Sequence, residues 1–266
     1  MHELDEAIER VISGPERKSR LISDDEKKVI AFHESGHAIV GHVLPHGDAI
    51  HKVTIIPRGR SLGSTWHLPE EEKFLGSKQE MLSDLASFMG GRVAEEIAIG
   101  DVTTGASNDI DRATKLAKQM VTQFGMSEKL GPQTFGEASH EVFLGRDFSA
   151  NADYSPEVAY EIDKEVARLI DEAYEKARNI LTDNRAQLDL MASVLVERET
   201  VGKDELEALL NNKWDEYLAK EKEDKDKDKD ADSGSEASAA PAEEPAAPAP
   251  VSEPPMAPGT PPAYNA

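Results

Sequence analysis

The chain has 266 residues, a formal net charge of −22 and no cysteine. This length suggests one large or two small domains, and the lack of cysteine excludes disulfides and thiolate zinc sites, which fits a reducing compartment. The acidic charge argues against nucleic-acid binding, and without an apolar run of about 18 residues the chain is expected to have neither a signal peptide nor a transmembrane helix of its own.

The N-terminal segment has the pattern of a short amphipathic helix over residues 2–13, which ends at Gly14 and Pro15. Because this pattern starts directly after Met1, we interpret it as the last helix of a preceding module. Residues 1–22 are therefore assigned to the end of that module and a linker. Ser23 and Glu26 then have the spacing of a capping box, which predicts the start of the next helix.

This next helix carries the pattern His-Glu-x-x-His at residues 33–37, within an apolar setting. On a helix, His33 and His37 lie one turn apart on one face, so both imidazoles can bind a single zinc ion. Glu34 is rotated by about 100° from His33 and is placed to take a proton from a zinc-bound water. A helix with two ordinary histidines is the alternative, and the apolar setting favours the metal motif over it.

Two β-type segments follow this helix. Residues 53–56 are β-branched and apolar, and residues 62–68 resume the pattern after a turn at 58–60, which predicts a small β-hairpin. An exposed edge strand can pair with an extended peptide. The candidate substrate-binding residues are Leu62, Gly63, Ser64, Thr65, Trp66 and His67. For His67, an ordinary exposed strand histidine is the simpler alternative.

Helical periodicity dominates the rest of the chain. It predicts helices over residues 77–98, from Ser107 to about Phe124, and over 156–181, 183–198 and 203–219. Within the first of these, the pair at Gly90 and Gly91 implies a packing reason, such as another backbone that crosses closely. Asn108 and Asp111 fit a capping pair at the start of the second. The predicted fold class is mainly α with a small β-hairpin or sheet.

The C-terminal part has a different composition. Residues 221–266 hold nine of the 15 prolines and begin with a run of alternating acidic and lysine residues. Such a segment cannot bury enough apolar surface to offset its chain entropy. We therefore expect a folded domain over residues 23–215 and a disordered, acidic, Pro/Ala-rich tail over 216–266. A solvated spacer is a simpler interpretation of this tail than a dedicated acidic interaction motif.

Two histidines leave a catalytic zinc site one protein ligand short. One known extension of the motif places a Gly three residues and a His six residues after the second His, but here those positions are Val40 and Val43. His42 and His46 follow at the helix end, off the ligand face, and are poor candidates. The remaining candidates are the carboxylates, among which spacing does not choose: Glu95, Glu96, Asp101, Asp109 and Asp111.

Seven stretches match one known family in order along the chain. They are residues 33–37, 51–60, 90–96, 104–110, 125–132, 142–147 and 181–184. Together they resemble the peptidase domain of the FtsH family of membrane-anchored, ATP-dependent zinc proteases, over roughly residues 4–212.

The resemblance implies a mainly helical, zincin-like fold with one Zn²⁺ per chain, bound by His33, His37 and Asp109. It makes Glu34 the catalytic base and places Glu95 beside the site, where it holds a ligand in position. Local features agree with Asp109 as the ligand and Glu95 as the residue that holds a ligand in position. Asp109 lies in the first turn of its helix, where the helix dipole favours a carboxylate, whereas Glu95 lies inside a helix on a longer side chain.

The resemblance also implies a homohexamer in which a ring of ATPase domains feeds unfolded or membrane-protein substrates to a ring of peptidase domains, on the cytoplasmic side of the cell membrane. No Gly-x-x-x-x-Gly-Lys-[Ser/Thr] sequence occurs in this chain. We therefore expect ATP and Mg²⁺ to be used only by an ATPase module that this chain lacks. Contact with the membrane is expected only through an N-terminal segment that it also lacks, so the chain alone is expected to be soluble.

The sequence thus predicts a zinc endopeptidase domain that hydrolyses unfolded polypeptides. One alternative is a non-catalytic helical oligomerisation scaffold that keeps the motif as structure, which measured zinc content would distinguish. Another is a metal-dependent hydrolase of a small molecule, which predicts a closed pocket rather than an open groove beside the hairpin.

Overall fold

The computed structural model of this chain describes Val11 and residues 22–46, 49–57, 62–67, 75–136 and 154–233. Three predicted features lie outside this part of the chain: the helix at 2–13, apart from Val11, the turn at 58–60, and the stretch at 142–147. The same holds for residues 234–266 of the predicted tail. The domain boundaries predicted after residues 22 and 215 remain predictions.

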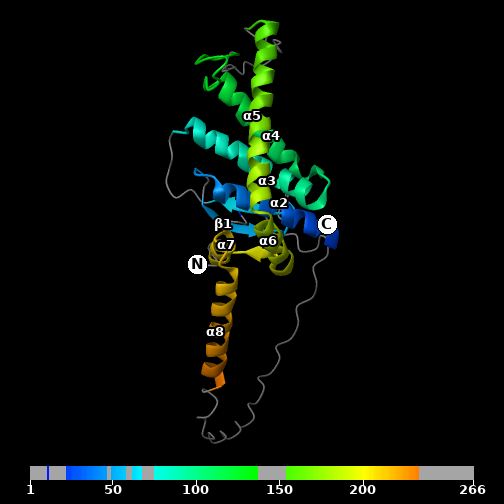
Figure 1. Ribbon diagram of the computed structural model, residues 1–266, viewed down its shortest axis with the longest axis vertical. Coiled ribbons are helices and arrows are strands. Elements are labelled where there is room, and N and C mark those ends of the chain that lie inside the picture. Colours follow the sequence, from blue (N-terminus) through cyan, green and yellow to red (C-terminus); the bar gives the residue numbers. More distant parts are fainter. Residues whose placement is uncertain are drawn as a thin grey trace, which may run out of the picture. The chain divides into compact units, whose positions relative to one another are not determined.

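The described residues form a mainly helical fold with a small antiparallel sheet, which confirms the predicted fold class (Figure 1). The helices are α2 (Asp24–Val43), α3 (Lys78–Ile99), α4 (Ser107–Thr122), α5 (Pro156–Asp183), α6 (Arg185–Arg198), α7 (Lys203–Leu210) and α8 (Trp214–Ser233). A 3₁₀ turn, Thr104–Ala106, leads into α4. Among the described residues, no helix combines the length and the apolar character needed to cross a bilayer.

The start of α2 is set by the predicted capping box. The Ser23 hydroxyl accepts a hydrogen bond from the Glu26 amide at 3.2 Å, and the Glu26 carboxylate accepts one from the Ser23 amide at 3.1 Å. For α4 the predicted capping pair of Asn108 and Asp111 is wrong. The 3₁₀ turn already pairs the Ser107 amide with the Thr104 carbonyl, so α4 continues from that turn without a side-chain cap.

The sheet has three strands in the order β2-β1-β3. Strands β1 (Ile50–Thr54) and β2 (Ser64–His67) pair antiparallel, which confirms the hairpin, although β1 begins three residues before the predicted start. The third strand, β3 (Thr200–Val201), pairs with β1 and was not predicted. It has only two residues, too few for an alternating pattern to show in the sequence.

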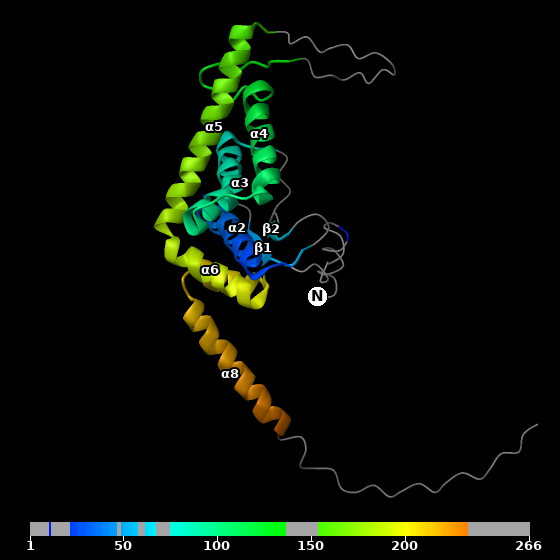
Figure 2. The ribbon, with the colours of Figure 1, turned by 90° about the vertical axis from the view of Figure 1, so that its right-hand side faces the viewer.

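Helices α2 and α3 cross at two glycines. A Cβ atom on Gly36 would lie 2.4 Å from the Gly90 carbonyl oxygen, and one on Gly90 would lie 2.8 Å from the Gly36 carbonyl oxygen. This close crossing is the packing reason that the glycine pair in α3 implies. Helix α5 packs along α3, α4 and α2, as Figure 2 shows, and α6 packs on α2. The core is apolar, with the largest fully buried side chains including Ile39, Leu85, Met120, Leu181 and Leu188.

Beyond α6 the structure differs from the prediction in two ways. The single helix expected over 203–219 is divided into α7 and α8, and Asn212 between them has a left-handed φ of 56°. Helix α8 also continues to Ser233, through the charged run that we predicted as the beginning of the disordered tail. The chain divides into one compact unit that ends at Lys220 and a second unit, Glu221–Ala266.

Candidate metal centre

Three side chains with metal-binding atoms converge where α2 meets the first turn of α4. The Nε2 atoms of His33 and His37 lie 3.0 Å apart. The Oδ2 atom of Asp109 lies 3.3 Å from Nε2 of His33 and 3.4 Å from Nε2 of His37. Among the described residues these three form the group of ligand atoms, all within 4.8 Å of one another, that could hold a metal ion.

The donor atoms fit a zinc ion in spacing and in kind. Tetrahedral coordination with bonds of 2.0–2.1 Å would separate the donors by about 3.3 Å. The three separations in this structure are 3.0, 3.3 and 3.4 Å. Two imidazole nitrogens and one carboxylate oxygen also form a donor set that catalytic zinc sites use, with the fourth position left for water.

Gly91 on α3 makes room for this arrangement. A Cβ atom at this position would lie 2.5 Å from His37 Nε2 and 2.5 Å from His33 Cε1. Real Cβ atoms do not approach other atoms so closely, so any larger residue would displace both imidazoles. The sequence pattern predicted a close backbone crossing for the pair of Gly90 and Gly91; Gly90 makes that crossing, and Gly91 faces the imidazoles.

The outer nitrogens of both imidazoles are held by hydrogen bonds. His33 Nδ1 lies 2.7 Å from Glu95 Oε1, and the other oxygen of Glu95 accepts a hydrogen bond from the Thr103 amide at 2.7 Å. His37 Nδ1 donates to the Ser87 carbonyl oxygen at 2.8 Å. A hydrogen-bonded Nδ1–H leaves the Nε2 lone pair free for a metal, as in many metal sites. Sequence reasoning missed Ser87 and Thr103, because the Ser87 carbonyl and the Thr103 amide that make these bonds are backbone groups, which every residue type other than proline carries.

Glu34 lies on the next face of α2 and is buried. The Thr65 hydroxyl on β2 donates a hydrogen bond to Glu34 Oε2 at 2.7 Å. Gly63 lies against the same carboxylate, since a Cβ there would be 2.7 Å from Oε1. Burial raises the pKa of Glu34, because a charged carboxylate is poorly solvated in this position, although the nearby imidazoles oppose that shift.

The carboxylates of Glu95 and Asp109 favour a positive charge on or between the two imidazoles of this centre. Burial alone would lower the pKa of His33, but its hydrogen bonds to Asp109 and Glu95 outweigh this and raise that pKa to about 10. Burial would likewise raise the pKa of Asp109, yet hydrogen bonds from His33 and His37 hold it well below its usual value. The pKa of Glu95 is also lowered, against its burial, mainly by the bond with His33. A proton or a metal cation can supply this positive charge.

The other ligand candidates lie apart from this group. Glu96 accepts a hydrogen bond from the Tyr174 hydroxyl at 2.5 Å, Asp101 accepts one from the Val102 amide at 2.8 Å, and Asp111 pairs with Lys115 at 2.6 Å. His42 and His46 are exposed at the end of α2 and just after it. Asp109 is therefore the carboxylate that the structure brings to both Nε2 atoms.

A groove of about 1060 Å³ opens over the candidate centre. Residues of α2, β2, α3 and the start of α4 line it, including His33, Glu34, His37 and Asp109. Of the six predicted substrate-binding residues, four lie in its lining: Leu62, Gly63, Ser64 and Thr65. Trp66 and His67 are not part of that lining, and the Trp66 indole donates instead to the Ser64 hydroxyl at 2.9 Å.

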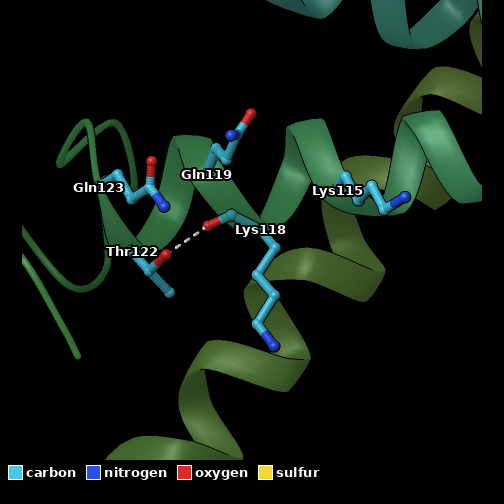
Figure 3. A pocket seen from close by; sticks show the side chains of 5 residues that line it. All are labelled: Lys115, Lys118, Gln119, Thr122 and Gln123. Atoms are coloured by element: carbon cyan, nitrogen blue, oxygen red, sulfur yellow. Dashed lines mark hydrogen bonds between the residues drawn. The ribbon is translucent and has the colours of Figure 1, made fainter. Parts of the chain in front are cut away.

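A second hollow, of about 230 Å³, lies on α4. Figure 3 shows that its lysine and glutamine side chains point in different directions, and that the Thr122 hydroxyl bonds to the Lys118 carbonyl of its own helix. The lining residues are Lys115, Lys118, Gln119, Thr122 and Gln123. Since these side chains do not converge, the larger groove is the candidate functional site.

The fold and the site together define a mainly helical domain in which a His-Glu-x-x-His helix contributes to a candidate metal centre. A family model described as Peptidase family M41 matches residues 20–209. The chain belongs to this peptidase family, which confirms the resemblance found in the sequence.

Relatives with the name ATP-dependent zinc metalloprotease FtsH cover most of this chain. The protein from Slackia heliotrinireducens is 58% identical over 222 residues, which is 84% of this chain and 28% of the relative. The Thermotoga maritima protein is 50% identical over 216 residues, which is 81% of this chain and 35% of the relative. The Bacillus subtilis protein is 49% identical over 211 residues, which is 79% of this chain and 33% of the relative. The chain thus spans about a third of the length of the relatives it matches.

Proposed function

We propose that this chain is a zinc-dependent endopeptidase domain. The observation that carries the proposal is the convergence of His33, His37 and Asp109 beside the buried Glu34, on the wall of one open groove. Membership of a peptidase family, and relatives named as zinc metalloproteases, support it. No finding favours the scaffold alternative, because a scaffold needs neither convergent ligand atoms nor a buried acid next to them.

In this proposal His33, His37 and Asp109 hold the zinc ion. When bound, zinc supplies a Lewis acid that lowers the pKa of a coordinated water towards about 7 and polarises a carbonyl group. The Glu95 carboxylate and the Ser87 carbonyl fix the two imidazole rings through their Nδ1 atoms. These outer bonds keep both Nε2 lone pairs directed at the same point and so reduce the reorganisation that binding requires.

Glu34 acts as the general base and then as the general acid. It accepts a proton from the attacking water and delivers it to the amine that leaves as the peptide bond breaks. Its burial raises its pKa from the ordinary value, towards the pH at which a proton carrier works best. The hydrogen bond from Thr65 keeps the carboxylate in place.

The proposed substrate is an unfolded polypeptide bound in an extended form. Strand β2 is at the end of the strand order, paired with β1, and the groove includes its first residues. A peptide that adds to this edge through backbone hydrogen bonds would be accepted with little regard to its sequence. The segment from Leu62 to His67 is the proposed contact, and the open groove fits a polypeptide better than an enclosed small molecule.

We place this activity in a larger assembly. The relatives are named ATP-dependent, and this chain matches only 28% and 33% of the length of two of them, so we propose that ATP and Mg²⁺ act on a separate module of such a protein. From the resemblance to the FtsH family we further propose a homohexamer at the cytoplasmic side of the cell membrane. This chain by itself is then expected to digest loosely structured proteins without ATP and to leave stable folded domains intact.

The proposal is tested by zinc analysis together with casein digestion. We expect about one zinc per chain and a digestion that a strong chelator stops. Glu34→Gln keeps the size of the side chain but removes the proton acceptor, so it should retain zinc and lose at least about 100-fold in activity. Glu172→Gln, at an exposed position on α5, is the matched control and should behave like the wild type.

Other outcomes have distinct meanings. Undiminished digestion by Glu34→Gln would remove the role given to Glu34. A wild-type chain without bound zinc and without digestion would favour the scaffold alternative. ATP-stimulated digestion of a stable folded protein by this chain alone would contradict the proposed division between peptidase and ATPase.

A further inference from the structure

We propose that Thr65 is a positioning residue that aims the Glu34 carboxylate, so that β2 orients the general base instead of only contacting substrate. This inference rests on the proposed function. It also adds a role for Thr65, which the sequence analysis placed among the substrate-binding residues of a candidate edge strand.

The first support is the hydrogen bond itself. The Thr65 hydroxyl lies 2.7 Å from Glu34 Oε2 and 3.3 Å from the backbone carbonyl oxygen of Glu34. A hydroxyl has one proton, and the shorter distance to a carboxylate oxygen is the stronger, charge-assisted bond. The Thr65 side chain is thus engaged with the carboxylate of the proposed base.

The second support is the confinement of the carboxylate. Glu34 is 7% exposed, and Gly63 of the same segment stands so close to Oε1 that a Cβ there would lie 2.7 Å away. The carboxylate therefore has Thr65 at one oxygen and the Gly63 backbone at the other. The hydroxyl at Oε2 and the close backbone at Oε1 together limit the orientations that this carboxylate can adopt.

The third support is the rigidity of the donor. Thr65 pairs with Val53 in the register of β2 and β1, and Val53 is fully buried. A β-branched residue on a strand has few side-chain rotamers. The sheet thereby fixes the hydroxyl, and the hydroxyl fixes Glu34. Small displacements of a catalytic group are costly, since a misplacement of about 1 Å can reduce the rate by about 100-fold.

The experiment compares Thr65→Val, Thr65→Ser and Thr182→Val in zinc-loaded protein. Valine has the shape of threonine without the donor, serine retains the donor, and the exposed Thr182, which bonds within its own helix, is the matched control. We expect Thr65→Val to lose roughly 10- to 100-fold in kcat, with KM within about twofold and with unchanged zinc content. Thr65→Ser should restore most of the activity.

A crystal structure of each variant gives a readout that does not depend on activity. In zinc-loaded Thr65→Val, the Glu34 carboxylate should be rotated or spread over more than one conformer, whereas in Thr65→Ser it should keep its position. If Thr65→Val does not fold, Thr65→Ala carries the same comparison, because it also removes the donor.

The outcomes separate this inference from the proposed function. An unchanged kcat in Thr65→Val, an increase in KM alone, or an unmoved Glu34 in its structure would overturn the positioning role. If wild-type digestion is zinc-dependent and Glu34→Gln is inactive, such a result leaves the endopeptidase proposal standing. If the wild type does not digest casein at all, the endopeptidase proposal fails, and the orientation of Glu34 in the structures still decides the role of Thr65.

Discussion

Within the described part of the chain, two regions with buried or half-buried carboxylates are built differently. On α5, the Glu165 side chain accepts a hydrogen bond from the Ser127 hydroxyl at 2.7 Å and two from the Arg168 guanidinium at 3.1 and 3.2 Å. At the candidate metal centre, Glu95 and Asp109 surround two imidazoles whose Nε2 atoms face each other at 3.0 Å.

The difference lies in where the positive charge comes from. Arg168 supplies it to Glu165 permanently and lowers the pKa of that carboxyl, so the pair is complete within the fold. At the metal centre the carboxylates depend on a proton or a cation held between the histidines. A buried carboxylate with its own arginine therefore indicates stability, whereas carboxylates that converge on imidazole lone pairs indicate a ligand site.

The largest loss of zinc binding and proteolysis should come from removing Asp109, the proposed third zinc ligand. Asp109→Ala takes away the oxygen that lies within 3.4 Å of both Nε2 atoms, so we expect tight zinc binding and proteolysis to be lost together. Metal analysis after dialysis and casein digestion measure this. Asp111→Ala, two residues later and paired with Lys115 on the exposed face, should retain both properties. A zinc-loaded Asp109→Ala would show that another residue completes the site.

Gly91→Ala is expected to cause the second-largest loss, which is a loss of zinc affinity. The added methyl group would lie 2.5 Å from His37 Nε2, so the imidazoles must move away from the metal position. If this overpacking costs about 3 kcal/mol, zinc affinity falls by roughly 100-fold. Chelator competition gives the affinity directly. Gly76→Ala is the control, because its methyl would meet only the flexible end of Met81. Wild-type affinity in Gly91→Ala would contradict the described imidazole positions.

Glu95→Gln should have a smaller effect. The amide still reaches His33 Nδ1 but carries no charge, and the loss of such an outer partner typically weakens metal affinity by about 10- to 100-fold. The neighbouring Glu96→Gln, whose carboxylate bonds to Tyr174, should leave zinc affinity unchanged. Complete loss of zinc in Glu95→Gln would instead place that carboxylate among the ligands.

The local features of both regions could be predicted from the sequence. The capping box at Ser23, the helix that carries His33 and His37, and the extents of α5 and α6 follow from short-range patterns. The choice of Asp109 among five carboxylates came from the family resemblance, because sequence spacing does not show which residues meet in space.

Contacts between distant segments could not be predicted. His33 and Glu95 are 62 residues apart, and Ser87 acts through a backbone carbonyl that every residue type possesses. The pairing of β1 with β3 joins Val53 and Val201 and depends on how α6 returns to the sheet. The Glu165 cluster was missed for the same reason, since Ser127 lies 38 residues from its partner.

The smallest effect is expected for Glu165→Gln, which should lower the free energy of unfolding by an amount that depends on pH. Glu165→Gln removes a charged acceptor for Arg168 and Ser127, and a hydrogen bond to a charged group contributes about 1.5–3 kcal/mol. Arg168 is partly exposed, so the low end of this range applies at neutral pH. Denaturant unfolding in the presence of a chelator measures the free energy without a contribution from metal. Glu207→Gln, exposed on α7, is the control.

The sign of the pH dependence follows from the lowered pKa of Glu165, which arises first from its bond with Arg168. Because the folded state holds this proton less tightly than the unfolded state, the stabilisation is complete above the unfolded pKa of about 4.3 and is lost as pH falls through the lower folded value. Wild type and Glu165→Gln should therefore differ most between pH 6 and 8 and converge in acid. If the difference instead stayed constant down to about pH 3, the carboxylate charge would contribute nothing, and Glu165 would stabilise the fold by packing alone.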